Sequence, residues 1–227
     1  MPATPASRPP GAPRAGFPDG LPTPGRFAHL HPDDGACLME AAALLATGRF
    51  TDSPRCTDPA LAALARAVND SVSEPARQAL WPLAADLADA RPVDRTYSPV
   101  LIGMVVDAAR RLRPASRRLR RGSTACRARA DRLAHARTPG VPARIADLLW
   151  WRGPGHHHLE HALRVLSAAP DADLRLSQLL RQAVYDARAT TSGASATPGP
   201  ATPPGARGLR PVPGLLRADV HGMRVRG

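Results

Sequence analysis

The stretch Ser98-Pro-Val-Leu-Ile-Gly-Met-Val-Val-Asp107 decides the fold, because its apolar residues cover every side of the α-helix that they would form. A helix without a polar face has to be surrounded by other elements, so we expect it at the centre of a domain. Ser98 followed by Pro99 is typical of a helix start. Pro114 cannot continue the helix and is expected to end it.

Apolar residues recur at helical spacing on both sides of this stretch, and no convincing β-strand alternation appears. We expect Asp33 or Asp34 to cap a first helix that ends at Gly48, and Asp58 with Pro59 to begin a second. Further helices are expected from Ser73 to a break at Trp81-Pro82, over 115–137, around Ile145 to Trp151, and over 156–169 and 171–188. The sequence therefore predicts an all-α fold, a single compact domain of about seven or eight helices over residues 33–188.

The two ends of the chain differ from this domain in composition. Residues 1–32 and 189–227 are mixtures of Pro, Gly, Ala, Thr, Ser and Arg without periodic apolar residues. Such segments bury too little apolar surface to offset the entropy lost on folding, so we expect two disordered tails. No segment has the ~18 consecutive apolar residues that a membrane span requires, and no signal-peptide pattern begins the chain. We therefore expect a cytoplasmic protein.

Three short motifs lie in the first half of the predicted domain. They are Gly35-Ala-Cys-Leu-Met-Glu40, Pro54-Arg-Cys-Thr-Asp-Pro59 and Arg66-Ala-Val-Asn-Asp70. In these motifs the chain resembles an uncharacterised actinobacterial and actinophage family. The resemblance is close over about residues 33–90 and only thematic, helix for helix, from there to about residue 188. It implies kinship, and it implies no activity, substrate or catalytic residue.

One segment matches a catalytic motif. His157-His-Leu-Glu160-His161 has the H-x-x-E-H pattern, in which two histidines one helical turn apart bind zinc and the glutamate activates the bound water. That mechanism needs a third protein ligand, usually a glutamate well downstream, and the chain has no glutamate after Glu160. We therefore favour a His-rich first turn of a surface helix, and keep a metal-dependent hydrolase as an alternative function.

A second set of candidate metal ligands consists of His31, Cys37 and Cys56. If the first two helices form a hairpin, these side chains would come together and make a zinc-stabilised interaction module. The spacing is no standard zinc pattern, since neither cysteine belongs to a C-x-x-C motif. We favour plain packing, with free or buried thiols. No phosphate-binding loop or other cofactor motif is present, so we expect no cofactor and no enzyme.

Positive charge is concentrated in one segment, which consists of a predicted helix and the residues just before it. The chain has no lysine, and residues 110–137 hold eleven arginines and one acid, which accounts for ten of the twelve net positive charges. A guanidinium face pairs well with carboxylates or phosphates. The sequence therefore predicts a non-enzymatic helical binding or adaptor protein whose partner is an acidic protein or a nucleic acid, although no aromatic residue is present there for base stacking. The residues expected to bind are Arg117, Arg118, Arg120, Arg121, Arg127, Arg129 and Arg132.

Trp150 and Trp151 are adjacent in the next predicted helix. Neighbouring helical residues point about 100° apart, so we expect one of them to be buried and the other to lie at the edge of the core. An exposed tryptophan beside an arginine face would be an interaction hot spot.

Overall fold

The computed structural model describes residues 21–92, 94–136 and 140–195, and in these ranges the regular elements are helices. The one β feature among them is an isolated bridge between Pro24 and Ala36. The prediction of an all-α domain is therefore confirmed. The helices are α1 (Leu38–Thr47), α2 (Pro59–Ser71), α3 (Glu74–Leu80), α4 (Leu83–Leu87), α5 (Tyr97–Leu112), α6 (Arg117–Ala134), α7 (Val141–Trp150), α8 (His156–Ser167) and α9 (Ala172–Ser195), with short turns η1 (Pro32–Asp34) and η2 (Trp151–Gly155).

Helix α5 lies at the centre of the domain. It packs against α2, α6, α8 and α9, and Ile102, Val105 and Ala109 are fully buried. The expected position is confirmed, but two details differ. Val100 is 56% exposed, so the helix is not covered on every side, and the helix begins at Tyr97 rather than after Ser98. Ser98 instead donates a hydrogen bond to Asp58 Oδ2 at 2.8 Å.

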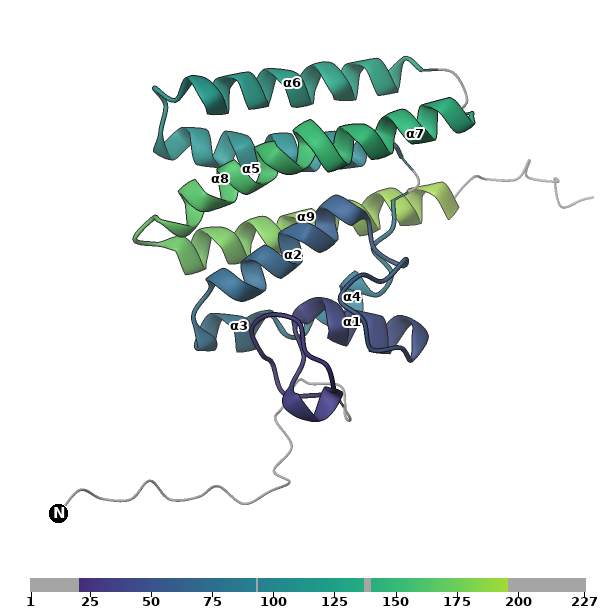
Figure 1. The fold of residues 1–227 in the computed structure, drawn as a ribbon, viewed down its shortest axis with the longest axis vertical. Coiled ribbons are helices and arrows are strands. Elements are labelled where there is room, and N and C mark those ends of the chain that lie inside the picture. The colour runs from purple at the N-terminus through teal and green to yellow at the C-terminus, as the bar shows by residue number, and fades with distance from the viewer. Residues whose placement is uncertain (1–20, 93, 137–139, 196–227) are drawn as a thin grey trace, which may run out of the picture. The chain divides into compact units, whose positions relative to one another are not determined.

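The helices are arranged in layers (Figure 1). Helix α6 forms one edge of the domain, and α1, α3 and α4 form the opposite edge. Helices α2 and α9 lie between them, next to α5 and α8. This arrangement leaves α6 in contact mainly with α5 and to a lesser extent with α8.

Local sequence signals fix most helix ends. Asp58 caps α2 by accepting hydrogen bonds from Ala60 N at 2.9 Å and Leu61 N at 3.2 Å, as expected. Gly48 ends α1 in the left-handed conformation, and the chain breaks between α3 and α4 at Trp81-Pro82. Two caps differ from the expectation. Ser73 precedes α3 but its side chain donates to Asp173 of α9, because that carboxylate lies within reach.

The first helix is capped by Cys37, not by Asp33 or Asp34, which lie in η1. The reason is a buried carboxylate: Glu40 is 1% exposed and accepts hydrogen bonds from Cys37 N and His29 N, both at 2.7 Å. The ring of His29 also lies 3.0 Å from Glu40 through Nδ1. Glu40 N in turn donates to Cys37 Sγ at 3.4 Å, which completes a reciprocal cap.

The segment before η1 belongs to the domain. Gly25 and Ala36 are joined by a backbone hydrogen bond of 2.8 Å, and Asn69 of α2 donates to Gly25 O at 2.9 Å. Phe27 N donates to Asp70 Oδ1 at 2.8 Å. The contacts of the folded part therefore extend at least to Gly25, on the N-terminal side of the boundary expected after residue 32. Helix α9 likewise continues past residue 188 to Ser195. The rest of the two expected tails, 1–20 and 196–227, lies outside the described residues.

We predict that Glu40→Ala lowers the free energy of unfolding by about 3 kcal/mol, because it leaves buried N–H groups without an acceptor. The matched control is Glu160→Ala, since Glu160 is exposed and its nearest ionic neighbour is His156 at 3.7 Å. That change should cost less than about 0.5 kcal/mol. Urea unfolding followed by circular dichroism measures both values. Equal losses in the two variants would contradict the structural role of Glu40.

Candidate functional site

Helix α6 is held to the domain by a narrow buried seam. Ser116 caps the helix by accepting a hydrogen bond from Leu119 N at 3.3 Å. The buried residues of the helix are Leu119, Gly122, Ser123 and Cys126. Gly122 permits a close approach, because a Cβ there would lie 3.2 Å from His158 Nδ1 of α8. The remaining sides of α6 are free to carry charged side chains to the surface.

Four arginines project from the side of α6 that faces away from the domain, and we call them the arginine face: Arg117, Arg120, Arg121 and Arg132. At about 100° per residue they fall within one sector of the helix. All four are exposed, and within the described part of the chain their side chains have no hydrogen bond or ion pair. A shallow groove runs over this face, lined by Arg117, Arg120, Arg121, Thr124, Ala125 and Ala128.

The other three arginines that the sequence assigned to the docking surface have partners inside the domain. Arg118 contacts the ring of His157, and Arg127 pairs with Asp107 Oδ2 at 2.9 Å. Arg129 pairs with Asp147 of α7 and is mostly buried, so it does not belong to the arginine face. The sequence pattern could not separate these residues from the arginine face, because their partners lie on other helices.

The ion pair of Arg127 affects the titration of Asp107. Burial acts to raise the pKa of this carboxyl, but hydrogen bonds from Ser123 and Arg127 and the charge of Arg110 outweigh it, and the pKa is lowered. Asp107 is therefore ionised at neutral pH. Asp131, the one acid in α6, forms no ion pair within the described residues.

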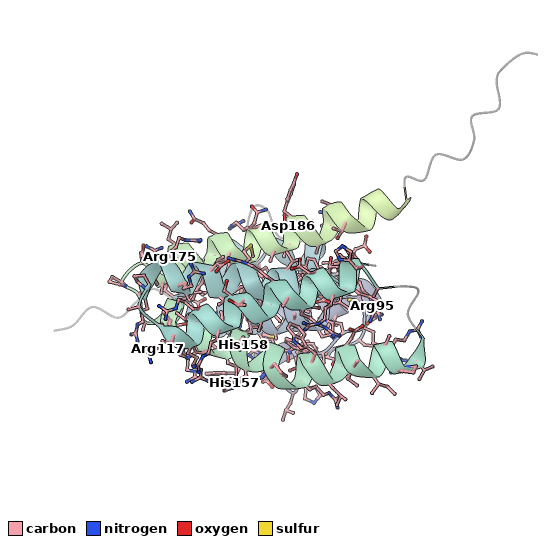
Figure 2. The ribbon with its side chains drawn as sticks, turned by 90° about the horizontal axis from the view of Figure 1, so that it is seen from above. Arg95, Arg117, His157, His158, Arg175 and Asp186 are labelled. Carbon is pink, nitrogen blue, oxygen red and sulfur yellow. The ribbon has the colours of Figure 1, made fainter. Side chains whose placement is uncertain are left out.

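The H-x-x-E-H segment forms the first turns of α8, beside the start of α6 (Figure 2). Glu160 lies 3.7 Å from Nδ1 of His156, a histidine outside the motif. Burial lowers the pKa of His161, and the positive charges of Arg118 and Arg164 lower it further. The histidines are thus surrounded by arginines, which repel a metal cation.

The candidate ligands His31, Cys37 and Cys56 have separate surroundings. His31 is exposed, Cys37 is buried in the cap of α1, and Cys56 is half-buried with its Sγ 3.7 Å from Thr57 Oγ1. Over residues 21–92, 94–136 and 140–195, no three His, Cys, Asp or Glu side chains form a group that could hold a metal ion. The structure therefore supports neither of the two metal alternatives with a ligand set.

Helix α7 has a feature that the sequence did not single out. Val141, Ile145, Leu148 and Leu149 are between 47% and 70% exposed, and we call them the apolar stripe of α7. The helix continues directly into the turn η2, and none of its residues is buried. Trp150 and Trp151 are both half-buried, which differs from the expectation of one buried and one at the edge. Periodicity identifies the apolar side of a helix but does not tell whether another element covers it.

No family model, no curated protein and no solved structure matches the chain. The resemblance to the actinobacterial and actinophage family therefore stays a prediction. None of the helices in the described ranges has the length and apolar character needed to cross a membrane.

The three thiols are predicted to differ in reactivity. Burial raises the pKa of both Cys37 and Cys126 to about 12, so these residues have little thiolate at neutral pH. Iodoacetamide should modify Cys56 at least about tenfold faster than either of them, because only Cys56 is half-exposed. Mass spectrometry of digested protein measures the rates, and urea-unfolded protein is the control in which all three react alike. Fast modification of Cys37 in the folded protein would contradict the buried cap.

Proposed function

We propose that this protein is a binding or adaptor protein, and that the arginine face of α6 docks an acidic segment of a partner protein. The observation that supports the proposal is the set of four exposed arginines that no carboxylate of the described residues neutralises. The proposed role is binding rather than catalysis. A cytoplasmic location belongs to the same proposal, and the three free thiols are in keeping with it.

Elsewhere in the domain, many guanidinium groups are satisfied internally. Arg66 donates to Asp52 O at 2.6 Å, Arg77 donates to Asn69 O at 3.0 Å, and Arg175 pairs with Asp171 at 2.6 Å. The arginine face departs from this pattern over several turns of one helix. The planar guanidinium groups of this face are suited to bidentate pairing with carboxylates. Arginines three or four residues apart on a helix repel one another. An anionic partner would reduce this repulsion, which destabilises the free protein.

Two observations favour an acidic protein over a nucleic acid. The groove on α6 has a floor of small side chains, Ala125 and Ala128, which lets the backbone of a partner approach. The apolar stripe lies on α7, which runs beside α6 and is linked to it by the Arg129–Asp147 pair. A partner that contacts both the arginine face and the apolar stripe needs acidic and apolar side chains, which a protein supplies. A nucleic acid would leave the apolar stripe exposed and would find no aromatic residue in α6 for stacking.

We predict that Arg120→Gln/Arg121→Gln weakens the binding of an acidic peptide by about tenfold, because it removes two of the four charges of the face. The probe is a fluorescein-labelled helical peptide with glutamates on one side and leucines on the other. The matched control is Arg49→Gln/Arg55→Gln, since both residues are exposed and have no side-chain ion pair in the described part. The control should change affinity by less than about twofold, because it removes the same charge elsewhere. Fluorescence anisotropy of the full chain measures the affinities.

A second comparison separates the two kinds of partner. Ile145→Ser/Leu149→Ser should weaken binding of the same peptide and leave binding of an oligothymidylate with equal charge unchanged. Tighter binding of the oligothymidylate than of the peptide would contradict the protein partner and favour a nucleic acid. If Arg120→Gln/Arg121→Gln and Arg49→Gln/Arg55→Gln weaken peptide binding equally, the arginine face is not the docking surface.

A further inference from the structure

A cavity of about 370 Å³ lies beside the C-terminal half of α6, away from the arginine face. Its walls come from the start of α2, the segment before α5, and helices α5, α6 and α7 with η2. Figure 2 shows Arg95, one of its residues, at the end of the domain opposite to Arg117 and His157. Its charged and aromatic lining includes Asp58, Arg95, Arg129, Arg144, Trp150 and Trp151.

Two arginines on one wall of the cavity share a single carboxylate. Arg95 donates from Nε to Asp147 Oδ2 at 2.7 Å, and Arg129 pairs with the other oxygen, Oδ1. Arg129 is 15% exposed, and its Nε is buried without a hydrogen-bond acceptor. Arg144 also lines the cavity and has no partner among the residues that are described. Asp147 thus serves both Arg95 and Arg129, and together with Arg144 this wall carries an excess of positive charge.

The remaining acids of the cavity are occupied by local structure. Asp58 caps α2 and accepts from Ser98, and burial raises the pKa of its carboxyl. Asp94 accepts from Thr96 N at 2.8 Å and from Thr96 Oγ1 at 2.6 Å. The lining includes four arginines and three aspartates, so its formal charge is +1. This charge matches a ligand with one negative charge better than a phosphate with two.

Another part of the cavity lining is apolar and aromatic. Trp150, Trp151, Leu133 and Leu148 contribute to the lining. The guanidinium carbon of Arg129 lies 5.9 Å from the ring centroid of Trp150, so the charged wall and the aromatic wall meet at this contact. A volume at the lower end of the usual range for ligand pockets suits a ligand of one or two flat rings.

We propose that this cavity binds a small aromatic carboxylate, with its ring against Trp150 and Trp151 and its carboxylate between Arg129 and Arg144. Carboxylate geometry matches the planar donors of the two guanidinium groups. The site shares Leu148 with the apolar stripe, but none of Arg117, Arg120, Arg121 and Arg132 lines the cavity, so substitutions of the arginine face leave it unchanged. The two proposals can therefore fail independently.

The test compares 2-naphthoate with its neutral isostere 2-naphthamide, using isothermal titration calorimetry on the full chain. We expect the carboxylate to bind at least about tenfold more tightly than the amide and to quench tryptophan fluorescence. Arg144→Gln should weaken naphthoate about fivefold, because Arg144 is exposed and unpaired and its loss leaves the fold intact. The matched control, Arg132→Gln, removes an equal charge outside the cavity and should change the affinity less than about twofold.

A second variant tests the buried end of the site. Arg129→Gln should abolish naphthoate binding. This result counts only if the thermal unfolding of the variant stays cooperative. If the variant does not fold, the affinity of Arg144→Gln for naphthoate decides the test. Equal affinity for naphthoate and naphthamide, or no binding of either, would overturn the proposal. Tighter binding of 2-naphthyl phosphate than of naphthoate would overturn the assignment to a carboxylate.

Discussion

The seam between α5 and α6 is the contact on which the rest of the structure depends. It buries only Leu119, Gly122, Ser123 and Cys126 of a helix that carries half of the protein's net charge. Two carboxylates flank the seam, Asp107 on α5 and Asp147 on α7, and each pairs with one arginine of α6. These pairs hold the helix in one rotation about its axis. That rotation sends the unpaired arginines outward and turns Arg129 toward the cavity.

The same helix thereby presents two environments for an anion. On its outer side the arginines are exposed, so each contact with a partner is weak and sensitive to salt, and affinity comes from their number. In the cavity, Arg129 acts with less screening, because it is mostly buried and touches an aromatic ring. An extended acidic surface suits the first environment. A small flat anion suits the second.

Much of the fold could be predicted from the sequence because its signals are local. Asp58 and Gly48 act at helix ends through neighbouring backbone groups, and Trp81-Pro82 breaks a helix wherever it occurs. The cap of α1 could not be predicted, since Cys37 takes that place only because Glu40 binds His29, eleven residues earlier. The three motifs behind the family resemblance are explained by contacts of this kind: Thr57 donates to Leu87 O at 2.7 Å, and Asn69 joins α2 to the segment before α1. The cavity depends on Arg95 and Asp147, which are 52 residues apart, and no local pattern relates them.

The central claim is that the outer side of α6 receives an acidic partner, and arginine side-chain NMR tests it most directly. The chain has no lysine, so each of its permanently charged basic side chains is an arginine. Each arginine gives an Nε–H signal. Titration with the acidic peptide should shift the signals of Arg117, Arg120 and Arg121. Those of Arg66 and Arg77, whose guanidinium groups donate to backbone oxygens inside the domain, should not move. Shifts confined to arginines outside α6, with those three signals unchanged, would contradict the claim.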